Sequence, residues 1–263
     1  MAFAIDPRGI PLTGVPYKAD LYTTDLELGD FTRRASGEIQ GPVFFPRDLR
    51  IAFGSGHDSE WSINFGDATY DVILNQKDYR YPFKPSSFSA DGSRLAYDQN
   101  GNIYVMPLEG DRKPQVFLST RYEQRNPVFS PNGHWISYDL SDGRGGRTDI
   151  WVRPYPGPEP AVRVSTEGGS HSRWSLDGTR IYFLNEAGKI MSADVTPGNT
   201  FRTSVPKVFM ENVQGIRSFL ISRDGTFYAI VNDTPNAPTK RDITVVTGWF
   251  DEVRELAGVT PRK

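Results

Sequence analysis

The sequence contains no cysteine, which excludes disulfide bonds, thiolate metal sites and a cysteine nucleophile. It also lacks an uninterrupted apolar run of about 18 residues, so no membrane span is predicted. The N-terminal region shows no charged segment followed by an apolar one, and no signal peptide is therefore predicted. These absences leave the compartment open, because both a cytoplasmic and an extracytoplasmic (periplasmic) location fit them.

An excess of charge of one sign is absent as well. The chain has 30 basic and 32 acidic residues and a formal net charge of −2. The two signs are mixed along the sequence, which argues against a nucleic-acid partner. The three histidines are His57, His134 and His171, and none belongs to an HxH or HExxH pair. We therefore predict neither a bound metal nor a cofactor.

Glycine, proline and aromatic residues are abundant, with 25 Gly, 20 Pro and 13% aromatics. Gly and Pro favour turns, and aromatic rings favour the pleated surfaces of strands, so the composition indicates β structure. The chain also repeats one unit, in which an aromatic or Ile precedes Ser, a turn ending in Gly and an apolar strand. The four clear copies span residues 88–97, 129–138, 174–183 and 221–230.

Two weaker copies lie upstream. In residues 42–53, Asp48 occupies the glycine position, and in residues 3–9 the strand that follows is poor. The six anchors lie near 9, 48, 92, 133, 178 and 225, in steps of 39 to 47 residues. Such a period is typical of one propeller blade of four short strands.

A second element supports the same period. It is a short strand, often opened by Asp or Asn, at residues 20–22, 71–73, 102–104, 149–151, 189–191 and 242–244. We therefore predict an all-β fold, a six-bladed β-propeller of four-stranded antiparallel blades that forms a single domain over residues 1–263. The Asp-Gly and Asn-Gly pairs predict type I′ turns with positive φ at Gly92, Gly133, Gly178 and Gly225.

The last blade is predicted to be incomplete, with strands at 219–221, 226–231 and 242–247. Residues 249–256 have the apolar spacing of a short amphipathic C-terminal helix. We expect this helix to cover the edge that an open blade leaves exposed, and the first and last blades to contact each other.

The repeat of aromatic-Ser-Pro-Asp-Gly, an apolar strand and Asp-Ile-Tyr/Trp resembles the TolB-like, or WD40-like PD40, β-propeller repeat. The resemblance is strong over residues 86–231, and residues 127–156 are the most similar stretch. Residues 243–253 are similar to the ends of PD40 propellers attached to bacterial kinases and transcriptional regulators. The resemblance implies a six-bladed propeller with a protein-binding role in a larger bacterial protein. TolB also carries a smaller α/β domain before its propeller, for which this chain has no room, so a place in the Tol–Pal system is not implied.

Catalytic and metal-binding patterns are weak. Residues 168–172, Gly-Gly-Ser-His-Ser, lack the closing glycine and the strand–helix setting of a nucleophile elbow, and a loop entering an inner strand explains them better. Asp139, Asp142 and Asp149 surround a Gly-rich loop and offer oxygen ligands for Ca²⁺, although their spacing is not that of an EF-hand. The calcium site stays open as an alternative, as does a cation site in the polar loop around His57.

Basic residues form a clearer pattern, because in a propeller the strand before each Ser-Pro-Asp-Gly turn lines the central channel. Lys84, Arg125 and Arg217 lie four positions before the aromatic or Ile that opens three of the repeats, and Asn126 and His171 lie one position later in their repeats. We expect these five residues at one channel mouth, with His171 joining the cations on mild acidification. A solvated rim whose charges pair with neighbouring acids is an equally open interpretation. Phe129 and Trp174 are expected to pack between blades instead.

We therefore predict a non-enzymatic, monomeric propeller that binds a protein or acidic peptide, as a sensor or interaction module of a larger bacterial protein. Two enzymatic alternatives remain. The chain is either the propeller domain of a prolyl-oligopeptidase-type peptidase or a small hydrolase acting in the central funnel.

Overall fold

The computed structural model describes residues 2–5, 19–24, 31–57, 59–78, 81–143, 146–157, 160–196, 198, 200–211, 216–221 and 227–231. These residues form antiparallel strands and no helix, and nothing among them has the length and apolar character of a membrane-spanning helix. The predicted C-terminal helix at 249–256 and the strand at 242–247 lie outside the described residues, as do Gly9 and Gly225.

The first two sheets share one long strand. Sheet 1 consists of β1 (Ala2–Ile5), β2 (Ala19–Thr24) and the first half of β3 (Phe31–Phe44). Sheet 2 consists of the second half of β3, β4 (Ile51–His57), β5 (Glu60–Gly66) and β6 (Tyr70–Gln76). The strand changes partner after Gly37, whose φ of 132° is open to glycine but not to most other residues.

The remaining strands form four more groups, each continuous in the sequence. Sheet 3 contains β7 (Lys84–Phe88), β8 (Arg94–Gln99), β9 (Asn102–Pro107) and β10 (Gln115–Leu118). Sheet 4 contains β11 (Glu123–Phe129), β12 (Trp135–Ser141), β13 (Asp149–Pro154) and β14 (Val162–Arg163). Sheet 5 contains β15 (Ser170–Trp174), β16 (Arg180–Leu184), β17 (Ile190–Thr196), β18 (Arg202–Thr203) and β19 (Lys207–Met210). Sheet 6 contains β20 (Ile216–Ile221) and β21 (Phe227–Val231).

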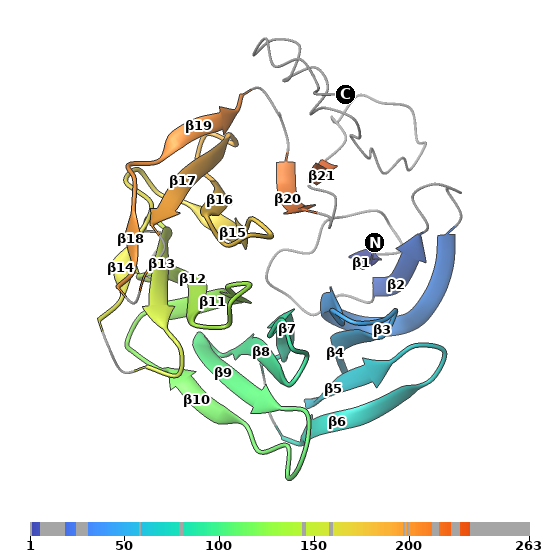
Figure 1. Cartoon of the computed structure of the whole chain (residues 1–263). Coiled ribbons are helices and arrows are strands. Elements are labelled where there is room, and N and C mark those ends of the chain that lie inside the picture. The colour runs from blue at the N-terminus through green and yellow to red at the C-terminus, as the bar shows by residue number, and fades with distance from the viewer. Residues whose placement is uncertain are drawn as a thin grey trace, which may run out of the picture.

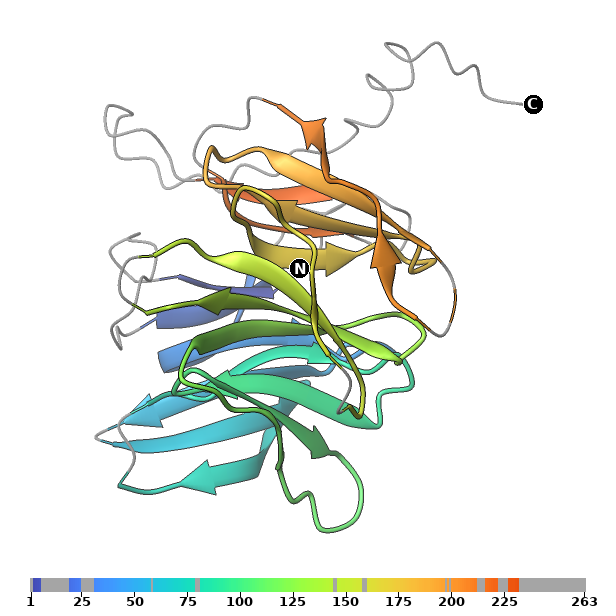
Figure 2. The same ribbon diagram turned by 90° about the vertical axis from the view of Figure 1, so that its left-hand side faces the viewer.

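The sheets are arranged around a common axis, with β7, β11, β15 and β20 nearest to it and β6, β10, β14 and β19 at the rim (Figure 1). The inner strands follow one another around the axis in sequence order, from β3 through β7, β11 and β15 to β20. Figure 2 shows from the side that the strands run mostly along this axis. The fold is therefore an all-β propeller. The count of six complete blades stays a prediction, since sheet 6 has two described strands.

In sheets 3, 4 and 5, a serine, an acidic or amide side chain and a glycine build the turn after the inner strand. In sheet 3 the Ser89 hydroxyl donates to the Asp91 carboxylate and accepts the Arg94 N–H, while the Gly92 N–H donates to the Ser89 carbonyl. The same bonds recur at residues 130–135 and 175–180. These bonds explain why the repeat has Ser and Asp or Asn in fixed positions.

The predicted positive φ is confirmed at Gly92 (68°), Gly133 (74°) and Gly178 (70°). The predicted type I′ turn is wrong, because the residue before each of these glycines is not left-handed. The bond from the glycine N–H to the serine carbonyl makes serine the first and glycine the fourth residue of the turn, the arrangement typical of a type I turn.

Two repeat assignments are also corrected by the strand pairing. The predicted strand at 71–73 lies in β6, at the outer edge of sheet 2, and the third position is taken by β5. In sheet 1, β1 pairs directly with β2, so no strand equivalent to β8 lies between them. The described part of this copy, residues 3–5, therefore does not take the place of an inner strand as in sheets 3, 4 and 5.

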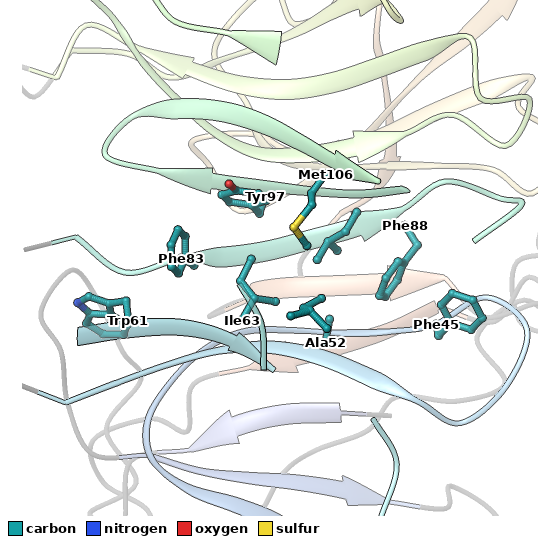
Figure 3. Close-up of a cluster of buried hydrophobic side chains, with 10 residues drawn as sticks. Phe45, Ala52, Trp61, Ile63, Phe83, Phe88, Tyr97 and Met106 are labelled. Atoms are coloured by element: carbon teal, nitrogen blue, oxygen red, sulfur yellow. The ribbon is translucent and has the colours of Figure 1, made fainter. Parts of the chain in front are cut away.

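The hydrophobic core lies between neighbouring sheets. Figure 3 shows one such layer, where Phe45, Ala52 and Ile63 of sheet 2 face Phe88 and Met106 of sheet 3. Similar layers join sheets 4 and 5 and sheets 5 and 6. Because sheets 3, 4 and 5 have apolar residues on both faces, each buries them between two neighbours, which explains the arrangement around an axis.

Candidate functional site

The starts of the inner strands gather at one end of the axis, and four of the five predicted site residues belong to the first residues of β7, β11 and β15. Lys84 pairs with Asp98 across β7 and β8, Arg125 pairs with Asp139 across β11 and β12, and Ser170 occupies the same place in β15. Arg217 belongs to β20, but its side chain lies outside the described part. The repeat alignment therefore places equivalent residues at equivalent positions in sheets 3, 4 and 5.

A bulge interrupts each inner strand at or next to this position. The pairing register shifts directly after it in β3, β11 and β15, one residue later in β7, after Pro85, and at Arg217 itself in β20. The bulged residues Gly41, Asn126 and His171 have φ of 52°, 51° and 57°. At Gly41 an added Cβ would lie 2.3 Å from the Pro85 carbonyl oxygen, so only glycine fits. A bulged residue leaves the strand ladder, and its N–H is then available to another partner.

Two buried carboxyl groups accept these N–H groups. The Asn126 N–H donates to Oδ2 of Asp98 (3.1 Å), and the His171 N–H donates to both carboxyl oxygens of Asp139 (3.1 Å each). Asn126 also joins the two acids, because its Nδ2 donates to Oδ2 of Asp139 (2.7 Å). Each acid thus ties its own sheet to the bulge of the next one.

Burial is the main influence on the pKa of both acids, since Asp98 is 3% exposed and Asp139 is 4% exposed. Burial raises the pKa of Asp98 to about 6, although the charges of Lys84 and Arg125 oppose the change. Burial raises the pKa of Asp139 to about 7 against the hydrogen bonds from Asn126 and His171, and the nearby Asp98 charge adds to the increase. The sequence pattern does not single out Asp98. The only signal is that Tyr-Asp occurs at the same place in the second strand of sheets 3 and 4.

The cations at this end differ in their surroundings. The exposed Arg125 guanidinium forms an ion pair with Glu123 at 2.7 Å. Lys84 is half-buried and has no ion pair with an acid in the described part of the chain. Arg173, farther along β15, is the cation whose charge acts on Asp139.

The predicted protonation of His171 on mild acidification is wrong. Burial, together with the Arg173 charge, lowers the pKa of the His171 imidazole to about 4. The ring is therefore neutral under mildly acidic conditions, and its Nδ1 lies 3.1 Å from the Ser170 hydroxyl oxygen. His171 contributes a neutral polar group, not a cation, to this end of the axis.

The nucleophile-elbow and calcium patterns do not assemble, and the side chain of His57, in the alternative cation site, lies outside the described part. Ser170 and His171 begin an inner strand, as the loop interpretation expected, and Asp139 bonds the His171 backbone and not its ring. Asp149 forms ion pairs with Arg147 and Arg163, whereas Asp139 accepts hydrogen bonds from Asn126 and His171. Among the described residues, no group of three His, Asp or Glu side chains has the geometry to hold a metal ion.

Comparison with known proteins agrees with the fold. No family model matches the chain, and no curated protein matches it in sequence. The structure is similar to TolB from Acinetobacter baumannii (TM-score 0.62, 21% identical, covering 88% of this chain and 60% of that one). It is similar to a putative TolB from Agrobacterium tumefaciens (TM-score 0.62, 17% identical, covering 89% of this chain and 91% of that one).

A further similar structure is that of a nidogen/laminin complex (TM-score 0.60, 13% identical, covering 81% of this chain and 82% of that one). Enzymes are also among the similar structures, including a gluconolactonase and an oligogalacturonate lyase. The chain therefore has a TolB-like propeller fold. Because one fold carries both binding proteins and enzymes, the fold alone does not decide whether this chain is an enzyme.

Proposed function

We propose that residues 1–263 form a non-enzymatic, monomeric propeller that binds an acidic segment of a protein or peptide where the inner strands start. The site consists of Lys84, Arg125, Asn126, His171 and Arg217. The observation that carries the proposal is the equivalent placement of Lys84 and Arg125 at the same step of adjacent inner strands. A nidogen propeller in complex with laminin supports the idea that this fold can present a protein-binding surface.

The two cations differ in how they meet a ligand. Lys84 has no ion pair with a described acid, so it offers its ammonium group directly. Arg125 exchanges Glu123 for a carboxylate of the ligand, and since both partners are exposed this exchange costs little. Asn126 and His171 are neutral and hold the loop geometry through their bonds to Asp98 and Asp139.

A binding measurement with a defined acidic peptide tests the proposal. A fluorescent hexaglutamate peptide is titrated with the full chain, and a hexalysine peptide serves as the opposite-charge probe. The double variant Lys84→Glu/Arg125→Glu is expected to bind hexaglutamate at least about tenfold more weakly, since rim charges set selectivity and encounter rate. The control is Lys113→Glu/Lys207→Glu, which makes the same charge change at exposed positions on outer parts of sheets 3 and 5.

Salt provides a second readout of the same interaction. Affinity of the wild type should fall as salt rises, because exposed charges are screened over about 8 Å at physiological ionic strength. Equal affinities of the double variant and its control would overturn the proposed site. Tighter binding of hexalysine than of hexaglutamate would overturn the acidic ligand.

A hydrolase acting at the same end is the second candidate, and one observation favours it. Asp98 and Asp139 are joined by Asn126, and both have a raised pKa, a combination common among catalytic acids and bases. A screen of ester, lactone and glycoside substrates on wild type and Asp139→Asn tests this candidate. Turnover that disappears in the variant would favour the hydrolase over the binding module.

A further inference from the structure

A pocket opens at the opposite end of the axis, where the inner strands end. Its volume is about 190 Å³, and it takes residues from sheets 3, 4, 5 and 6. Phe88, Phe129, Trp174 and Ile221 end the four inner strands and supply apolar walls. The expected packing of Phe129 and Trp174 between sheets is also observed, since Phe129 packs with Ala96 and Val105 of sheet 3, and Trp174 packs with Trp135 and Val152 of sheet 4. These rings are therefore held rigidly where they face the pocket.

Arg173 is the one charged residue among the described residues that line this pocket. Its Nη1 donates to the Ser172 carbonyl at 2.8 Å, and it forms no ion pair with any acid of the described chain. A guanidinium has five N–H donors, so most of its capacity is free of described protein acceptors. Asp139 acts on it electrostatically, but that carboxyl group is already bonded to Asn126 and His171.

A half-buried guanidinium beside apolar walls is unfavourable unless an anion meets it. Burial lowers the pKa of the Arg173 guanidinium, which reflects this cost. A carboxylate matches the planar guanidinium with two parallel hydrogen bonds. A cavity of about 150 Å³ lined by apolar residues accommodates a benzene-sized ring, so a pocket of about 190 Å³ has room for one ring and a short acid chain.

We propose that this pocket binds a small monocarboxylate with a single aromatic ring. The carboxylate pairs with Arg173, and the ring packs against Phe129 and Trp174. The site lies at the other end of the inner strands from Lys84 and Arg125, so it goes beyond the proposed peptide-binding function and does not depend on it. Leu176, 52% exposed at the pocket, extends the apolar wall toward solvent.

The test uses 3-phenylpropionate and its neutral amide, 3-phenylpropionamide, as probes of the full chain. The indole N–H of Trp174, which donates to the Val128 carbonyl and the Ser137 hydroxyl, reports binding as a shift of its NMR signal. The acid is expected to saturate this signal with a Kd in the millimolar range, and the amide to bind at least about tenfold more weakly. An amide that binds as tightly as the acid would overturn the proposal.

Variants locate the interaction. Arg173→Gln should abolish the preference for the acid, and Arg173→Lys should retain part of it because a point charge lacks the bidentate geometry. If Arg173→Gln fails to fold, the lysine variant and the acid-to-amide ratio of the wild type still decide the question. Leu176→Ser, at an exposed position, should weaken both probes by a similar factor, whereas unchanged affinities would count against the pocket.

The two proposed sites can be tested independently of each other. Lys84→Glu/Arg125→Glu should lose hexaglutamate binding and keep 3-phenylpropionate binding. Loss of both ligands in this variant would place the monocarboxylate at the wrong end of the axis and overturn the inference. Loss of the monocarboxylate in Arg173→Gln with hexaglutamate binding retained would support it.

Discussion

Replacing Asp98 with Asn should make the stability of the chain less dependent on pH. The structure raises the pKa of this buried carboxyl from 3.8 to about 6, mainly through burial. The folded state therefore binds more protons than the unfolded state between these values, so stability falls as pH rises through this window. A pKa difference of about two units changes the free energy of unfolding by about 3 kcal/mol in total. About 2 kcal/mol of this change takes place between pH 4 and pH 7.

The asparagine variant removes the titration and keeps an acceptor for the Asn126 N–H, since its Oδ1 replaces the carboxyl oxygen. The free energy of unfolding of Asp98→Asn minus that of the wild type should therefore rise by about 2 kcal/mol from pH 4 to pH 7. Urea denaturation at a series of pH values measures this difference directly.

Asp177→Asn is the matched control, because hydrogen bonds from Ser175 and Thr179 lower the pKa of Asp177 to about 2. The stability that this exposed carboxylate contributes is present at pH 4 and above and is lost as pH falls from there through about 2. The free energies of unfolding of Asp177→Asn and of the wild type should therefore change nearly in parallel from pH 4 to pH 7. Parallel curves for Asp98→Asn and wild type would refute the reasoning, since they would mean that burial does not hold the proton on Asp98.

Three further changes test the packing between sheets and the turns. Ser87→Ala should lower the free energy of unfolding, measured in urea, by about 2 to 4 kcal/mol. The Ser87 hydroxyl donates to the Pro127 carbonyl and accepts the Phe129 N–H, so both buried groups lose a partner. A decrease below about 0.5 kcal/mol would contradict this. Gly133→Val should cost about 1 to 3 kcal/mol through φ alone, since nothing lies within 4 Å of its added Cβ. Gly92→Val should cost more in the same assay, because the Phe45 ring lies 2.5 Å from the added Cβ; equal costs would contradict the close approach of that ring to Gly92.

The strongest repeats were predictable because their side chains make the turn themselves. Ser89, Asp91 and Gly92 each have a bond or a φ that few residue types supply, such as Asp or Asn at the Asp91 position, so the motif is visible in the sequence. The strand β5 was not assigned from the sequence because Glu60–Gly66 carries no opening Asp or Asn. The third strand of this repeat was therefore assigned to residues 71–73, which begin with Asp but belong to the next strand.

The site was only partly predictable for a different reason. Repeat spacing placed Lys84 and Arg125 at equivalent steps, since spacing along the chain fixes register within each sheet. The sequence did not point to Asp98, and it suggested Asp139 only as a calcium ligand. The observed role of both acids depends on a bulge in the neighbouring sheet, and a contact between sheets leaves no spacing signal. The neutral state of His171 likewise depends on burial and Arg173, which composition does not reveal.

The most direct test of the proposed binding end is a map of amide signals during titration of the full chain with hexaglutamate. The N–H groups of Asn126 and His171 mark the end where the inner strands start, and those of Gly92, Gly133 and Gly178 mark the turns at the other end. The account predicts that the Asn126 and His171 signals shift in a saturable way while the three glycine signals stay in place. Shifts confined to the glycine signals, or no saturable shift at either end, would contradict it.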